Sequence, residues 1–225
     1  CNMVTLEQIK TNPYIKELVL RTDQNIQTKG YTEHGFRHAE LVSTITRNVA
    51  AKLGFSKKDQ ELVSIAGYLH DIGNFLHRED HYGWSVTLVY PILLGLKMPP
   101  EDMVTVLNAI YSHDQPTSEI FNPIAAILIL GDKSDVHRSR VPLKDVNPYT
   151  LKTDIHTRVN YAVTRSFLRV EKEVKEIVLE LDIDTAVTPL MEYFEAFISR
   201  MTHCRRAAEY LGLRFSLVMN GHKVL

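Results

Sequence analysis

The sequence predicts a mainly α protein, in which a helical bundle is followed by a small C-terminal extension with the order β-β-α-β. Up to about residue 140, apolar residues recur at helical spacing and turn residues separate the segments. After Pro142 and Pro148 the pattern changes to the alternation typical of half-buried strands. We therefore expect a helical domain over residues 1–145 and an α+β extension over residues 146–225.

The helices of the bundle are predicted from apolar spacing and from residues that begin or end helices. Thr32 is expected to cap the second helix, which Gly54 ends. Asn122 followed by Pro123 is typical of a cap and a first helical residue. Six segments follow this rule, at about residues 5–20, 33–53, 58–71, 83–97, from Pro100 through Ile110, and 123–137.

The extension is predicted from three patterns. Apolar and polar residues alternate over 177–183 and again over 213–219, and residues 159–170 are expected to form the hairpin partner of the first of these strands. Between the strands, apolar residues from Leu190 to Leu211 recur every three or four positions, which predicts an amphipathic helix. We expect this helix to cover the sheet, and a homodimer contact through it is the alternative.

Composition limits the classes of function. The chain has 225 residues, is 44% hydrophobic and carries a formal charge of −1, so no global field favours duplex nucleic acid or an anionic membrane. No apolar run approaches the roughly 20 residues that cross a bilayer. The two cysteines, Cys1 and Cys204, do not form a disulfide framework, so the cytoplasm is the expected location.

Polar residues that can bind metal interrupt the buried faces of the predicted helices. His38, His70, His113 and Asp132 each continue an apolar stripe on a different helix, and Asp71 follows His70 directly. One buried histidine is usually satisfied by hydrogen bonds, but burying several polar groups without partners costs several kcal/mol. A shared cation removes this cost. Imidazole and carboxylate ligands suit Fe, Mn, Ni, Co or Zn, so we expect one or two divalent transition-metal ions.

The order of these residues resembles the H…HD…D pattern of the HD-domain metal-dependent phosphohydrolase superfamily. Residues 70–73 read HDIG, as in the subgroup of that name, and the resemblance covers roughly residues 30–140. It implies a helical fold and a first metal ion. The residues at the motif positions are His38, His70, Asp71 and Asp132.

Members of the superfamily with two ions have two further histidines between the HD pair and the last aspartate. His81 and His113 occupy those places, and the resemblance implies that Asp71 bridges the ions. His77 competes with His81, but it lies only seven residues after His70 and is expected to be an exposed loop residue.

Other polar residues near the motifs are candidates for supporting roles. His34 is a candidate proton donor, a partner of a metal ligand or a solvated residue. Lys133 is expected to neutralise phosphoryl oxygens, and the alternative is a lysine that extends from a helix edge to solvent. Asp114 and Asp135 are candidates for orienting imidazoles, or are solvated helix ends.

Further residues could contact a substrate. Arg37, Arg138 and Arg140 add positive charge, although solvated loop positions are the preferred interpretation for the last two. Three aromatic residues near the expected ligands could stack on a base or pack in the core. They are Tyr82, Trp84 and Tyr111.

The resemblance implies hydrolysis of a phosphate ester or anhydride in a small molecule of the nucleotide class, through attack of metal-bound hydroxide on phosphorus. Asp71 and Lys133 are the expected catalytic residues, with His34 or a water protonating the leaving oxygen. Asn74 stands where cyclic-dinucleotide phosphodiesterases of this class usually have lysine. The HD-x-x-E pattern of nucleoside-monophosphate phosphatases and guanosine-alarmone hydrolases is also missing, because Asn74 and Phe75 fill those places. The sequence is therefore most similar to small stand-alone HD hydrolases, which include the diadenosine tetraphosphate hydrolase group.

Two alternatives belong to other classes of function. A di-iron oxygenase with the HD fold would use much the same ligands to activate O₂. A non-catalytic sensor would keep the site as a metal- or nucleotide-binding module, with the extension as its partner interface.

Overall fold

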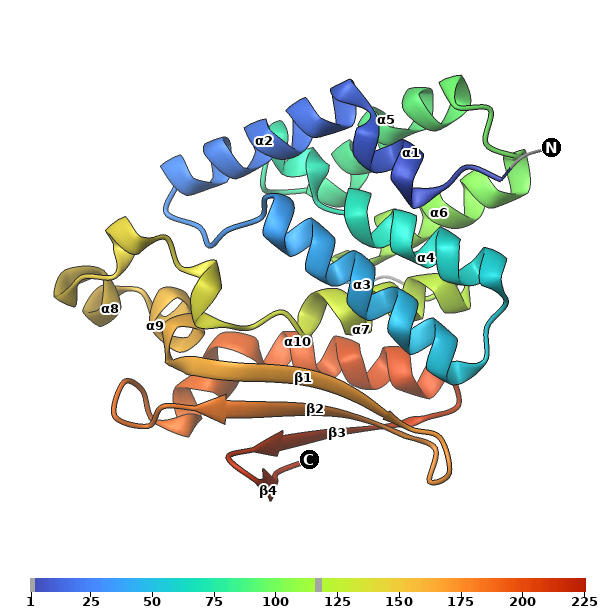
Figure 1. The fold of residues 1–225 in the computed structure, drawn as a ribbon. Helices are drawn as coiled ribbons and strands as arrows, with labels where there is room; N and C mark the ends of the chain where they lie inside the picture. The colour runs from blue at the N-terminus through green and yellow to red at the C-terminus, as the bar shows by residue number, and fades with distance from the viewer. Residues whose placement is uncertain (1–2, 116–118) are drawn as a thin grey trace.

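A computed structural model describes residues 3–115 and 119–225 of the chain; Cys1 lies outside these residues. Among the described residues there are ten α-helices and one four-stranded sheet, which confirms the predicted mainly α class with a small β extension (Figure 1). The helices are α1 (Leu6–Thr11), α2 (Pro13–Thr28), α3 (Phe36–Leu53), α4 (Lys57–Leu69), α5 (His81–Gly95), α6 (Pro100–Ser112), α7 (Pro123–Lys133), α8 (Pro148–Thr153), α9 (Ile155–Ala162) and α10 (Leu190–Tyr210). The 3-10 helices are η1 (Ile72–Phe75), η2 (Arg138–Arg140) and η3 (Leu143–Asp145), and the strands are β1 (Val163–Glu171), β2 (Glu176–Ile183), β3 (Arg214–Met219) and β4 (His222–Lys223).

Helix boundaries in the first half differ from prediction at three places. The first segment is two helices, because Asn12 caps a new helix that begins at Pro13. Thr32 is not a helix cap: the second predicted helix begins at Phe36 after Gly35, so residues 31–34 form an extended approach to it. The last helix of the bundle, α7, ends at Lys133 instead of near residue 137.

Helix α7 is the centre of the bundle. It packs against α3, α4, α6 and α10, and every residue from Ile124 to Lys133 is buried. A helix that is apolar on all sides is stable only where it is surrounded, which explains the run of residues 124–130. Asp132 and Lys133 therefore end this helix deep inside the molecule.

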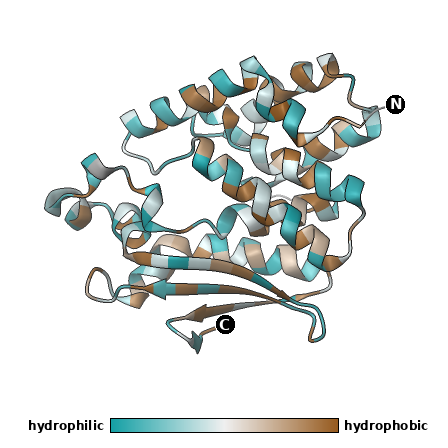
Figure 2. Ribbon diagram, in the orientation of Figure 1, coloured by the Kyte–Doolittle hydropathy of each residue, from teal (hydrophilic) through white to brown (hydrophobic). Residues whose placement is uncertain are grey.

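The extension begins with helices that the alternating pattern did not predict. Residues 159–162 were expected in a strand but belong to α9, because the side chain of Asp154 accepts hydrogen bonds from the backbone N–H groups of His156 and Thr157 and so begins a helix. The strand β1 starts only at Val163 and pairs antiparallel with β2. Hydrophilic and hydrophobic residues are interspersed along β1 and β2 (Figure 2).

The sheet has the strand order β1-β2-β3-β4, and α10 connects β2 to the parallel strand β3. Helix α10 lies between the sheet and the bundle, in contact with β2 and β3 on one side and with α7 on the other (Figure 1). One continuous hydrophobic core contains residues of both regions, including Ile127, Phe197 and Leu217. The proposed boundary at residue 145 and the homodimer alternative stay predictions. In the described part of the chain, no helix has the length and apolar character to span a membrane.

Candidate metal centre

The His70–Asp71 pair lies where α4 ends. Ser56 caps the start of α4, whose second half, from Leu62 to Leu69, is buried on every side, and His70 is its C-cap. The chain then turns into η1, where Gly73 packs directly on the start of α5. A Cβ at Gly73 would lie 2.0 Å from the carbonyl oxygen of His81, so only glycine permits this approach. The HDIG turn thereby places His81 against the pair.

The structure brings together all six residues expected to bind metal. His38 lies on α3, His70 and Asp71 follow α4, His81 begins α5, His113 ends α6 and Asp132 lies on α7. All six are buried. They form three overlapping groups that could hold a metal ion, each with its ligand atoms within 4.8 Å of one another.

Asp71 lies between two groups of imidazoles and directs one oxygen to each. Its Oδ2 atom is 3.3 Å from Nε2 of both His38 and His70, and its Oδ1 atom is 3.3 Å from Nε2 of His81 and 3.8 Å from Nε2 of His113. Asp132 Oδ1 completes the first group at 3.4 Å from His38. With metal–nitrogen bonds of about 2.1 Å, ligand atoms of a tetrahedral ion lie roughly 3.4 Å apart, so these spacings fit.

The hydrogen bonds of the imidazoles fix which nitrogen carries the proton. The Nδ1 atoms of His70, His81 and His113 contact backbone carbonyl oxygens at 2.8, 3.0 and 2.6 Å. A carbonyl only accepts, so each Nδ1 donates and each Nε2 of a neutral ring carries a lone pair. His81 Nε2 and His113 Nε2 face each other at 3.1 Å, and the Nε2 atoms of His38 and His70 at 3.2 Å.

Such a cluster favours positive charge at its centre. Burial lowers the pKa of His70, but the carboxylates of Asp71 and Asp132 outweigh it and raise this pKa to about 10. Burial lowers the pKa of His113 to about 4, helped by nearby His70 and His81. A single proton can be shared by only one pair of facing Nε2 atoms. Here two such pairs and the carboxylates of Asp71 and Asp132 lie together. The donor set therefore fits one or two divalent metal ions.

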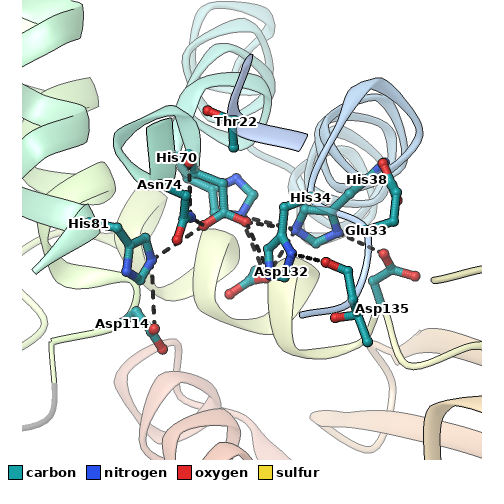
Figure 3. Close-up of polar contacts among 12 residues, drawn as sticks. Thr22, Glu33, His34, His38, His70, Asn74, His81, Asp114, Asp132 and Asp135 are labelled. Carbon is teal, nitrogen blue, oxygen red and sulfur yellow. Dashed lines mark hydrogen bonds and ion pairs between the residues drawn. The ribbon is translucent and has the colours of Figure 1, made fainter. Parts of the chain in front are cut away.

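His38 has a carboxylate behind it. Its Nδ1 atom contacts Asp135 Oδ2 at 2.7 Å, as expected for an orienting carboxylate. Arg37 holds the same oxygen at 2.8 Å, and Arg140 Nε lies 3.6 Å from it. Burial raises the pKa of Asp135, but Arg140 and His38 outweigh it and hold the carboxyl well below its usual range. Figure 3 shows His38 and Asp135 on one side of Asp132, with His81 and Asp114 on the other.

Two supporting residues differ from expectation. Arg140 is not a solvated loop residue: it is 2% exposed and donates hydrogen bonds to the carbonyl oxygens of Glu33 and Asp135. Asp114 does not lie behind an imidazole, because its Oδ2 atom is 3.6 Å from His81 Nε2, on the side where that ring would bind metal. Asp114 is therefore a further oxygen donor beside the second group.

Lys133 is buried and not a lysine that reaches solvent from a helix edge. Its Nζ atom is 2.8 Å from Asp132 Oδ2 and 2.5 Å from Asp114 Oδ1. Burial lowers its pKa, but these two carboxylates outweigh it and raise the pKa above the ordinary value. Lys133 is thus a fixed positive charge at the edge of the cluster.

His34 lies in the extended segment before α3, with Nε2 4.0 Å from Asp71 Oδ2. Its Nδ1 atom contacts the carbonyl oxygen of Thr32 at 2.5 Å and so donates. Burial, with Arg140, holds the pKa of His34 well below its usual range. The neutral ring presents the lone pair of Nε2 to the site, and that His34 protonates a leaving oxygen stays a prediction.

The remaining candidates are not part of the ligand cluster, although the ring of Tyr82 packs edge-on against His81, with centroids 5.8 Å apart. His77 is exposed, as expected, and accepts a hydrogen bond from the backbone of Glu79. Arg138 is exposed and lies over the ring of Tyr161. The aromatic residues are not core residues: Trp84 and Tyr111 are 43% and 41% exposed, and the ring of Tyr82 packs edge-on against Tyr111.

Sequence reasoning missed two arginines at the cavity beside the cluster, Arg78 and Arg200. Arg78 lies in the loop between η1 and α5 and gave no signal. Arg200 could have been found, because it lies three residues after Phe197 and four before Cys204, and both of these are buried on α10. An arginine on the buried face of an amphipathic helix indicates that polar or charged groups lie where that face packs.

Comparison with known proteins agrees with this geometry. The family model described as "HD domain" matches residues 35–135, which confirms the resemblance to HD-domain proteins over that segment. The chain is also similar to an uncharacterized protein, MJ1020, of Methanocaldococcus jannaschii, with 29% identity over 164 residues. The match covers 63% of this chain and 63% of that protein.

Proposed function

We propose that this protein is a metal-dependent phosphohydrolase that cleaves a phosphate ester or anhydride of a small molecule of the nucleotide class. The observation that carries the proposal is Asp71, whose two oxygens face two separate groups of imidazoles. The HD domain, which is typical of metal-dependent hydrolases, supports it. We assign the first ion to His38, His70, Asp71 and Asp132, and the second to Asp71, His81 and His113.

Divalent ions in such a site would lower the pKa of bound water and neutralise phosphoryl oxygens. The chain itself contributes fixed positive charge around the same cavity, from Lys133, Arg78, Arg140 and Arg200. Preorganised cations stabilise the charge that develops on phosphoryl oxygens. These cations favour phosphoryl transfer over the di-iron oxygenase alternative. Activation of O₂ does not require several fixed positive charges beside the metal site.

The proposed partner is a small phosphorylated molecule and not duplex nucleic acid. The net charge is −1, and four cations, Lys133, Arg78, Arg140 and Arg200, line the small cavity beside the expected ligands. We retain the cytoplasm as the proposed location, because Cys204, the cysteine among the described residues, is buried and free.

The test is metal content together with hydrolysis. We expect one to two transition-metal ions per chain in freshly purified protein, and none in a His70→Ala, Asp71→Ala double variant. His77→Ala is the matched control, because His77 is exposed and lies in the adjoining loop. With Fe, Mn, Ni, Co and Zn supplied in turn, the wild type and the control should hydrolyse p-nitrophenyl phosphate or a nucleotide panel, and the double variant should not. A protein that stays metal-free in all five metals contradicts the proposal.

A further inference from the structure

A second pocket adjoins the metal centre. It has a volume of about 330 Å³, at the lower end of the range for small-molecule sites. Its walls come from the segment before α3, the loop before α5, the start of α9 and the middle of α10. It shares His34, Arg78 and Arg200 with the small cavity beside the metal ligands. These three residues therefore lie at the boundary between the metal centre and the pocket.

Arg200 is the cation at this boundary that has no anionic partner among the described residues. Its guanidinium lies over the ring of Phe197, with the central carbon 4.4 Å from the ring centroid. Burial lowers its pKa, and nearby Arg140 and Arg78 lower it further, against raising effects from Asp132 and Asp114. A half-buried guanidinium held near two others is costly unless an anion joins them.

Two of the other cations at the cavity are already paired with carboxylates. Lys133 contacts Asp114 and Asp132, and Arg140 contacts Asp135. Arg78 Nη2 is 3.9 Å from Asp114 Oδ2, a longer contact that leaves it partly available.

Asp154, the carboxylate among the described residues that line the second pocket, forms no ion pair with Arg200. Asp154 caps α9, and its two oxygens accept from the backbone of His156 and from the hydroxyl of Thr157 at 2.9 and 2.8 Å. No carboxylate of the described residues is thus paired with Arg200, and its guanidinium at the pocket wall is open to an anionic ligand.

We propose that Arg200, with Arg78, binds a second phosphoryl group of the substrate, next to the one attacked at the metal centre. The inference rests on the proposed function and narrows its substrate class to phosphoanhydrides, with a preference over phosphate monoesters. It also assigns a role to the C-terminal extension, because α10 supplies the residue that selects the substrate. A guanidinium matches phosphate oxygens through paired hydrogen bonds.

The reaction at this site would be hydrolysis of a phosphoanhydride. Water forms a new P–O bond at the phosphorus beside the metal ligands, and the bridging P–O bond of the anhydride breaks. The departing phosphoryl group takes the electron pair of that bond and is held by Arg78 and Arg200, and the proton released from water passes to solvent.

The test measures binding of inorganic pyrophosphate and inorganic phosphate to the full chain with its own metal, by isothermal titration calorimetry. We expect wild type to bind pyrophosphate more tightly than phosphate by about tenfold or more. Arg200→Gln should weaken pyrophosphate binding about 10- to 100-fold, as for loss of a charged hydrogen-bonding group, and leave phosphate binding unchanged. Arg205→Gln is the matched control, because Arg205 lies on α10 and its side chain is 63% exposed.

Equal binding of the two anions by wild type, or unchanged pyrophosphate binding by Arg200→Gln, overturns the inference. If that variant does not fold, Arg200→Lys replaces it: this change keeps the charge but loses the paired donors, so pyrophosphate affinity must still fall. The proposed function fails separately. Pyrophosphate binding that depends on Arg200 without any hydrolysis would reject the enzyme and keep the anion site. Hydrolysis of phosphate esters, together with pyrophosphate binding that does not depend on Arg200, would keep the enzyme and reject the anion site.

Discussion

His38 and His81 point their Nε2 atoms at opposite oxygens of Asp71, but what lies behind each imidazole differs. Behind His38 is the carboxylate of Asp135, fixed by two arginines. Behind His81 is a backbone carbonyl. A carboxylate makes the imidazole more basic and holds its orientation more firmly than a carbonyl does.

The surroundings differ in the same sense. In the first group, the side chain of Asp132 is 11% exposed and lies in the last turn of α7, which is buried from Ile124 to Lys133. Beside the second group, the side chain of Asp114 is 30% exposed and faces the cavity. We infer that the first group binds its ion tightly and keeps it, whereas the second group exchanges its ion more readily. Asp71 faces both groups, so substitutions in either group test whether the two ions bind independently.

The largest effect is expected from Asp71→Asn, which removes the charge that both groups share. We expect both ions to be lost and hydrolysis to fall to background, because the remaining imidazoles lack a bridging anion. Metal content by plasma mass spectrometry and a far-ultraviolet circular dichroism spectrum measure this. Asp182→Asn is the control, because its side chain is 45% exposed on β2. A variant that keeps a full first ion would show that the groups are independent.

His81→Ala tests whether the two groups can be separated. We expect loss of the second ion alone, with the first retained, because His81 does not contact the His38 side of Asp71. The reverse change, His38→Ala, should remove both ions, since the weaker group then stands alone. Metal content of the two variants after identical dialysis gives the result. Equal loss in both variants would contradict the asymmetry.

Asp135→Asn tests the support behind His38. We expect the affinity for the first ion to fall about 10- to 100-fold, the usual effect of removing such a partner. The second ion should be less affected, because its imidazoles bond to carbonyls. Competition with a fluorescent chelator measures both affinities. Asp145→Asn, at the end of η3, is the control. An equal decrease in the affinity for both ions would show that Asp135 supports both groups and not His38 alone.

Much of the first group could be predicted from the sequence, because His38, His70 and Asp132 each continue the buried stripe of a periodic helix. Helical periodicity places such residues in the interior. A buried imidazole or carboxylate without a partner is costly in free energy, so a hydrogen-bond partner or a metal ion is expected there. The support behind them could not be predicted. Arg140 bonds to the carbonyl of Glu33, 107 residues away, and no local pattern reports a contact of that separation.

The extension shows the same limit. Its strands and its long helix were predicted, but residues 159–162 were included in the hairpin partner of the strand at 177–183, whereas they belong to α9. The cap at Asp154 decided the local structure instead. The position of α10 between sheet and bundle is a tertiary property, so the role of Arg200 emerges only when the pocket is assembled.

The smallest effect is expected from Gly73→Ala, which acts on the second group through the backbone. The new Cβ would meet the carbonyl oxygen of His81 at 2.0 Å and the backbone nitrogen of Ser85 at 2.4 Å, so the start of α5 must move away. Such overpacking lowers the free energy of unfolding by about 1–3 kcal/mol. Because His81 begins α5, affinity for the second ion should fall, whereas the first group lies on the other side of Asp71 and should keep its ion.

Gly83→Ala is the matched control for this change. Gly83 lies on the same helix, but a Cβ there meets nothing within 4 Å. Alanine should raise the free energy of unfolding by about 0.5–1 kcal/mol, since glycine is a poor helix former. Urea denaturation and metal content measure both variants. If Gly73→Ala lowered the affinity for both ions equally, the approach of η1 to α5 would support the whole cluster, and the contrast between its two halves would rest on Asp135 alone.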